Sequence, residues 1–146
     1  MRSFRVLVAL ALVAVLAVGW AATVSATGGR PITTSLSGAE EVPGPGDPDG
    51  TGWAGITVNP GLGKVCWWLQ VSDIATATFA HIHEGDAGVA GPVVVGLSAP
   101  ASGQSSGCED VSRELAKALI QNPTHYYVNV HNAAYPAGAV RGQLGD

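Results

Sequence analysis

The stretch Lys64–Asp73, with the sequence KVCWWLQVSD, is the clearest structural signal in this chain because its apolar side chains fall on every second residue. Successive side chains of a β-strand point to opposite faces of a sheet, so a period of two predicts a strand with one buried face. The residues expected on the core face are Val65, Trp67, Leu69 and Val71. The opposite face would carry Cys66, Trp68, Gln70 and Ser72.

Similar short runs lie on both sides of this stretch, and connections rich in glycine, proline and small polar residues separate them. Such runs predict further strands at Ile32–Ser37, Trp53–Asn59, Phe79–Glu84, Pro92–Leu97, His125–His131 and Ala139–Leu144. The segments Gly38–Gly52, Gly85–Gly91 and Ser98–Gly107 are expected to be loops.

One helix is predicted after Ser98–Gly107. Asp110 is its expected cap, Val111 its first residue, and Asn122–Pro123 its end, because apolar residues between them recur every three or four positions. Several short strands with one short helix predict an all-β chain, folded as an antiparallel immunoglobulin-like or Greek-key β-sandwich.

The first 26 residues have the pattern of a signal peptide. Arg2 and Arg5 precede an uninterrupted apolar stretch, and Val24–Ala26 offers a cleavage site after Ala26. The apolar segment Val6–Trp20 has 15 residues, whereas a membrane-spanning helix needs about 20. We therefore expect a signal peptide at residues 1–26 and one domain at residues 27–146, secreted or held in the periplasm or cell wall, with membrane contact only during export.

The charge of the chain argues against one class of partner, and its cysteines predict a covalent link. Residues 27–146 carry five basic and eleven acidic residues, a formal net charge of −6, which excludes the basic surface that nucleic acid requires. The two cysteines, Cys66 and Cys108, predict one disulfide in an exported chain. Two free thiols, or a metal site built from cysteine and histidine, are the alternatives.

All four histidines fall in two of the predicted strands. In Thr78–Gly85 (TFAHIHEG), His81 and His83 are two residues apart and share one strand face. In the strand His125–His131 (HYYVNVH), one face is apolar. The other face carries His125, Tyr127, Asn129 and His131. We expect these two polar faces to be open to solvent and to adjoin each other.

Two interpretations of these polar faces remain open. Neutral imidazole nitrogens bind copper and zinc, so His81, His83 and His131 are candidate ligands of one ion, with His125, Tyr127 and Asn129 as supporting polar groups. Alternatively, the same side chains form hydrogen bonds across the strands and fix the loop Gly85–Gly91 without any metal. No catalytic residue is predicted.

Three other features of the sequence indicate a function less clearly. Trp53, Trp67 and Trp68 are expected to pack in the core or between sheets rather than to form a carbohydrate platform. Glu40–Glu41 is expected on a solvated surface, and Arg141 in a structural ion pair.

Three ordered motifs resemble the chordin-type (CHRD) domain family. They are Leu36–Pro43 (LSGAEEVP), Ala80–Gly85 (AHIHEG) with Ala87–Val94 (AGVAGPVV), and Tyr126–His131 (YYVNVH) with Tyr135–Leu144 (YPAGAVRGQL). The resemblance implies a secreted, immunoglobulin-like β-sandwich in the stand-alone form found in exported bacterial proteins. Animal chordin binds bone morphogenetic proteins, but this chain lacks chordin's cysteine-rich modules, so growth-factor binding is not implied.

The His-x-His pair also resembles the copper-binding pair of copper–zinc superoxide dismutases, although those enzymes need further histidines and an aspartate. The sequence therefore predicts a non-enzymatic, extracytoplasmic binding or scaffolding module that recognises an extracellular ligand or protein. The alternative is a copper- or zinc-binding protein with a dismutase-like histidine cluster and redox activity.

Overall fold

The computed structural model describes residues 28–145. The predicted signal peptide at residues 1–26 lies outside this range. The strands are β1 (Arg30–Ser37), β2 (Thr51–Asn59), β3 (Lys64–Ser72), β4 (Ala77–Glu84), β5 (Val93–Leu97), β6 (Gln104–Asp110), β7 (Tyr126–Asn132) and β8 (Val140–Gln143). The helices are α1 (Arg113–Gln121) and two single-turn 3-10 helices, Gly38–Glu40 and Pro123–His125. No helix in the described range is long and apolar enough to span a bilayer.

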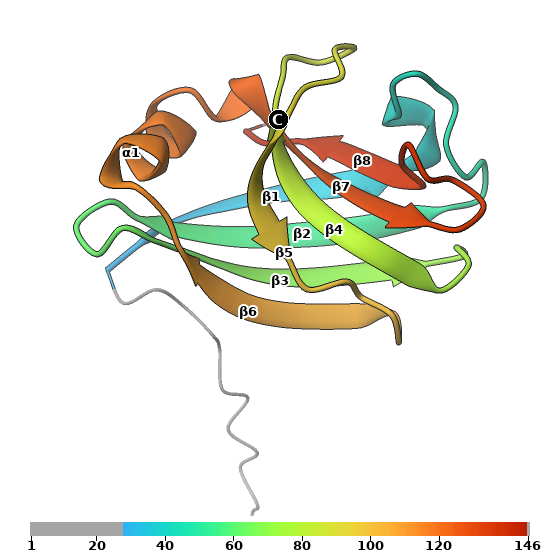
Figure 1. The fold of residues 1–146 in the computed structure, drawn as a ribbon, viewed down its shortest axis with the longest axis horizontal. Coiled ribbons are helices and arrows are strands. Elements are labelled where there is room, and N and C mark those ends of the chain that lie inside the picture. Colours follow the sequence, from blue (N-terminus) through green and yellow to red (C-terminus); the bar gives the residue numbers. More distant parts are fainter. Residues whose placement is uncertain (1–27, 146) are drawn as a thin grey trace, which may run out of the picture.

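The strands form one eight-stranded antiparallel sheet in the order β5-β4-β7-β8-β1-β2-β3-β6. β8 and β1 join at the register pair Ser37–Arg141, and the sheet bends there so that its two halves face each other (Figure 1). The result is nearly a barrel. This confirms the all-β, antiparallel class with one α-helix, while the immunoglobulin-like Greek-key arrangement stays a prediction.

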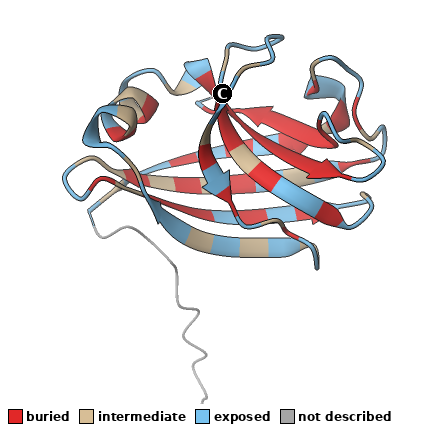
Figure 2. Cartoon of the chain, in the orientation of Figure 1, coloured by how far each residue is buried: buried red, intermediate tan, exposed pale blue. Residues whose placement is uncertain are grey.

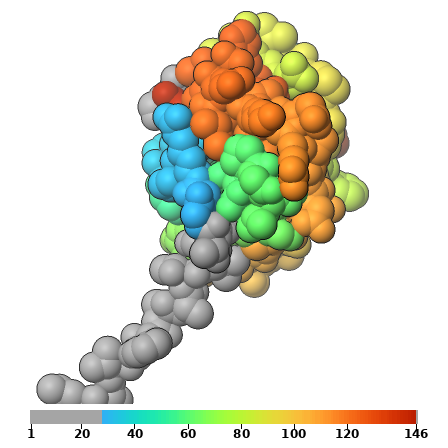
Figure 3. Space-filling view, turned by 90° about the vertical axis from the view of Figure 1, so that its left-hand side faces the viewer, coloured from blue at the N-terminus to red at the C-terminus, as the bar shows by residue number. Residues whose placement is uncertain are grey.

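The hydrophobic core fills the space between the two halves. It includes Val65, Trp67, Leu69 and Val71 of β3, as their alternation predicted, together with apolar residues of the other strands. α1 covers one end through Ala116 and Leu119, which are both fully buried. Figure 3 shows this end of the molecule, with α1 (orange) above the β2–β3 hairpin (green) and beside β1 (blue).

The sequence prediction for the segment before α1 was wrong. Residues 104–110 form β6, which pairs with β3 along its whole length, whereas a loop was expected through Gly107. Asp110 ends this strand, and the helix is capped by Ser112, whose hydroxyl accepts a hydrogen bond from the backbone N–H of Leu115 at 3.0 Å. β6 has no alternating apolar residues because it is an exposed edge strand held by backbone hydrogen bonds.

Cys66 and Cys108 are register partners in β3 and β6. Their sulfur atoms lie 2.08 Å apart, which is the disulfide distance that the sequence predicted. This bond ties the polar edge strand β6 to its neighbour β3.

Candidate metal site

The outer face of β4, β7 and β8 carries a continuous polar surface on the side of the sheet opposite the core. In register order, His81 faces Asn129, which faces Arg141, and His83 faces Tyr127, which faces Gln143. The structure thus places the polar residues of β4 and β7 side by side. It does not leave them open to solvent: β7 and β8 are buried along their whole length (Figure 2).

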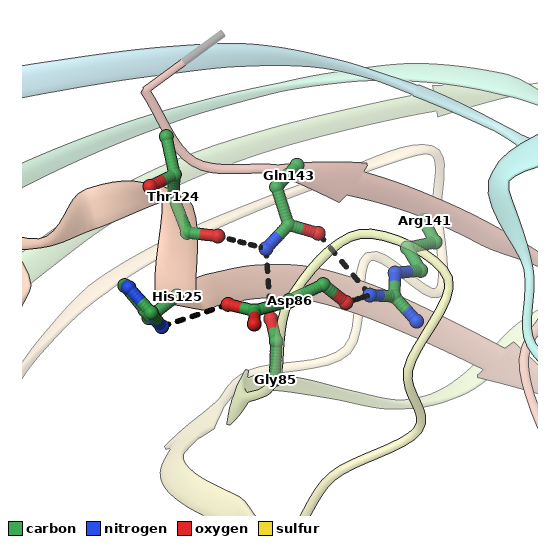
Figure 4. Close-up of polar contacts among 6 residues, drawn as sticks. All are labelled: Gly85, Asp86, Thr124, His125, Arg141 and Gln143. Atoms are coloured by element: carbon green, nitrogen blue, oxygen red, sulfur yellow. Dashed lines mark hydrogen bonds and ion pairs between the residues drawn. The ribbon is translucent and has the colours of Figure 1, made fainter.

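The loop 85–91 covers part of this face, and polar side chains of β8 form hydrogen bonds to its backbone. Arg141 donates to the backbone oxygens of Asp86 at 2.9 Å and Val89 at 3.0 Å. Gln143 donates to the oxygen of Gly85 at 2.8 Å (Figure 4). No local pattern indicated this role for Arg141, whose expected ion pair is replaced by hydrogen bonds to backbone oxygens.

The far end of the same loop is fixed by Gly91. Its carbonyl oxygen lies 2.9 Å from His83 Nδ1, and its N–H donates to the Tyr127 hydroxyl at 3.0 Å. A Cβ at Gly91 would stand 1.6 Å from the backbone oxygen of Glu84, so only glycine permits this approach. The loop was expected to be fixed by polar side chains of this face, and these contacts do so.

A second cover comes from the segment after β1. Glu41 is only 5% exposed, and its Oε2 accepts a hydrogen bond from Asn129 Nδ2 at 3.1 Å. Burial raises the pKa of Glu41 to about 7, against the lowering effects of Asn129 and the Arg141 charge. The expectation that Glu41 is solvated was wrong, because the segment folds back over the sheet instead of extending into water.

Three histidines converge under this cover. His81, His83 and His131 each offer a ring nitrogen, and these nitrogens all lie within 4.8 Å of one another. The shortest contact joins His81 Nδ1 and His131 Nε2 at 3.2 Å. These are the three residues that the sequence analysis named as candidate ligands.

Backbone carbonyls fix the orientation of two of the rings. Nδ1 of His83 faces the oxygen of Gly91 at 2.9 Å, and Nδ1 of His131 faces the oxygen of Pro136 at 3.1 Å. A carbonyl oxygen can only accept, so both Nδ1 atoms carry the proton and both Nε2 atoms present a lone pair. His83 Nε2 is buried and has no hydrogen-bond partner.

Burial also favours the neutral form of the three imidazoles. It is the first cause that lowers the pKa of His81, His83 and His131. Neighbouring histidines lower the pKa of His81 and His131 further, and the Arg141 charge does the same for His83. Neutral imidazole is the form that binds a metal ion.

A stack of planar groups supports His83 from behind. The His83 ring lies parallel to Tyr127, with ring centres 4.9 Å apart and planes 8° apart. The Arg141 guanidinium carbon lies over the same Tyr127 ring, 3.5 Å from its centre. This stack leaves the His83 ring little freedom to turn.

The fourth histidine is not part of the cluster. The strand begins at Tyr126, and His125 ends the 3-10 helix before it, so strand alternation does not apply to it. Nδ1 of its exposed ring lies 2.7 Å from Oδ1 of Asp86, and the ring is not among the three that converge. The expectation that His125 shares the polar strand face was therefore wrong.

Comparison with known proteins agrees with the motifs. The family model described as CHRD domain matches residues 32–144. The chain belongs to the CHRD domain family. No curated protein and no solved structure gives a significant match to it. The matched range contains the whole histidine cluster and both covering segments, and membership in the CHRD family indicates an extracellular β-fold module.

Proposed function

We propose that this CHRD domain is an exported metal-binding module, in which His81, His83 and His131 hold one zinc or copper ion outside the cytoplasm. The observation that supports it most is the buried Nε2 of His83, which has no partner. An unpaired buried polar atom costs about 1–3 kcal/mol. A metal ion between the three rings removes that cost.

The spacing of the nitrogens supports the same assignment. Two nitrogens bound to one tetrahedral zinc ion at about 2.0–2.1 Å lie about 3.3 Å apart. His81 Nδ1 and His131 Nε2 are 3.2 Å apart. In the absence of an ion, one hydrogen bond between these two rings satisfies them, but it leaves His83 Nε2 unpaired.

The donor set favours zinc or copper over hard cations. The cluster consists of three imidazoles without a carboxylate, whereas calcium and magnesium require oxygen ligands. Gly91 and Pro136 supply the carbonyl contacts that orient ligating histidines in many metal sites. Three protein ligands leave a fourth position for water or an incoming ligand.

Access to that position lies on the side of His81, which is only half-buried. Phe79, 63% exposed, stacks beside the His81 ring at 6.1 Å. A dismutase-type centre needs more histidines than this cluster has, and His125 is engaged with Asp86. The geometry thus favours metal binding without catalysis, in which the ion links β4 to β7, and the contacts of His83 with Gly91 and of His131 with Pro136 connect it to the segments that hold these carbonyl groups.

The test is a titration of metal-free protein, prepared with a chelator, with zinc and separately with copper. We expect one ion per chain and an unfolding free energy that rises by about 2.7 kcal/mol at a free-metal concentration 100 times Kd. His83→Ala and His131→Ala should abolish stoichiometric binding, and His125→Ala is the matched control that should retain it.

Circular dichroism of each variant shows that it is folded. No ion above background in the folded wild-type chain, or equal binding by His83→Ala and His125→Ala, would leave the cluster with a structural role only.

A further inference from the structure

The outer face of the other half of the sheet carries two exposed tryptophans. Trp53 of β2 is 38% exposed and Trp68 of β3 is 39% exposed. Their ring centres lie 5.2 Å apart in an edge-to-face arrangement with planes 61° apart. Both were expected to pack in the core or between sheets, but of the three tryptophans in the described strands only Trp67 is buried.

The Trp53 ring rests on the sheet at a position that only glycine allows. A Cβ at Gly55 would stand 2.6 Å from the Trp53 ring, so a larger residue would displace the indole. Gly55 is the register partner of Trp68. The two indoles therefore lie together at Gly55, where the lack of a side chain leaves room for the Trp53 ring.

Exposed residues around the indoles are polar and uncharged. Register places Ser35 beside Trp53 and Thr33 beside Gly55 on β1, and Gln70 beside Trp53 on β3. Exposed neutral residues of this face are Thr33, Ser35, Gln70, Gln104 and Ser106.

Charged side chains on these outer rows are confined to one end, where Lys64 and Asp110 pair with each other at 2.5 Å. The outer rows of β1, β2, β3 and β6 thus offer no net charge to a partner.

A polar hollow adjoins the same surface. It has a volume of about 310 Å³, lies between β1 and β8, and is lined by Thr34–Ser37, Glu40, Gly142 and Gln143. Ser35 belongs to this hollow and is also the register partner of Trp53. The aromatic pair and the hollow are therefore neighbouring parts of one surface.

From these observations we propose that the Trp53–Trp68 face binds a neutral polysaccharide chain. The C–H groups on the face of a sugar ring carry partial positive charge and match the negative face of an indole. Hydroxyl and amide side chains beside the indoles match the sugar hydroxyls. A protein partner steered by complementary charge is not favoured, because the outer rows around these indoles carry no net charge.

The experiment measures binding of the chelator-treated protein to insoluble cellulose and chitin, and tryptophan fluorescence with cellohexaose and chitohexaose. We expect binding to at least one of these neutral glucans or aminoglucans, with a shift in tryptophan emission. Trp53→Ala and Trp68→Ala should each weaken it by about tenfold or more. Phe79→Ala, which removes an exposed ring from the opposite half of the sheet, is the matched control and should leave binding unchanged.

Two results would overturn the proposal: no binding to any of the four probes, or binding that the tryptophan variants retain in full. A third contrary result is binding to an anionic polysaccharide alone, such as alginate, because an uncharged face gives no reason for it. Trp53→Phe keeps an aromatic ring and should retain part of the affinity, which separates loss of stacking from loss of folding. The chelator makes these outcomes independent of metal binding.

Discussion

The outer faces of the two halves of the sheet obey the same strand alternation but have opposite environments. On β7 and β8 every residue is buried, although half of the side chains are polar. On β6 every residue is exposed or half-buried, and the outer indoles of β2 and β3 are more than a third exposed. Alternation determines which side chains leave the core, whereas the connecting segments determine whether those side chains meet water.

The outer face of β4, β7 and β8, called the covered face below, needs polar side chains because the loop 85–91 places backbone groups against it. The loop 85–91 brings carbonyl groups over the sheet, and buried carbonyl groups need donors. Arg141 and Gln143 supply them. The uncovered face has no such requirement, and its neutral side chains are free for an external ligand.

The largest loss of stability is expected on the covered face, from substitution of Arg141. Arg141→Ala removes donors from two loop carbonyls and the stack on Tyr127, so we expect it to lower the unfolding free energy by about 3–5 kcal/mol. Chemical denaturation measures this loss. Arg141→Lys keeps the charge without the planar donor fork and should recover only part of the stability. A loss below about 1 kcal/mol for Arg141→Ala would show that the loop is not held from β8.

The next effect is the pH dependence of the covered face. The folded pKa of Glu41 is about 7 against an ordinary 4.5, so the folded chain retains a proton that the unfolded chain has lost between these values. The unfolding free energy must therefore fall as pH rises from about 4.5 to 7.

Glu41→Gln removes this titration while it keeps an acceptor for Asn129. As pH rises through that range, we expect the unfolding free energy of the variant to increase by about 1–3 kcal/mol relative to that of wild type, allowing for screening. The three histidines titrate in both proteins, so their opposite effect cancels in the difference. Denaturation of both proteins at pH 5 and pH 8 measures this change. An equal pH dependence of the unfolding free energy in the two proteins would mean that Glu41 is solvated.

The smallest effect is expected on the uncovered face. Trp68→Ala removes a partly exposed ring that contacts Trp53 at its edge, and we expect it to cost no more than about 1 kcal/mol. The same denaturation assay applies, and a loss equal to that of Arg141→Ala would remove the distinction between the two faces.

Much of this comparison could be predicted from sequence, because alternation is a local property. The core face of β3 and the shared face of His81 and His83 follow from runs of six to ten residues, whereas His131 joins them through the pairing of β4 with β7, which was expected but is not a local property. β6 could not be found in this way, since a polar edge strand lacks an apolar period and gains its stability from backbone pairing with β3.

The parts of the site that come from distant segments also escaped prediction. Glu41 approaches Asn129 across 88 positions of the chain, and no local pattern reports such a contact. His125 was misplaced because the strand begins one residue later, at Tyr126, and alternation has no meaning before a strand begins. Local sequence thus predicted which side chains share a strand face. It did not predict which distant segments pack over that face, because this depends on tertiary contacts.

The most direct test of the metal site is a crystal of the protein soaked in zinc, measured on both sides of the zinc absorption edge. We predict one anomalous peak about 2 Å from His83 Nε2, His131 Nε2 and a nitrogen of His81, beneath the loop 85–91. A well-ordered cluster without a peak, or zinc found only at the exposed His125–Asp86 pair, would contradict it.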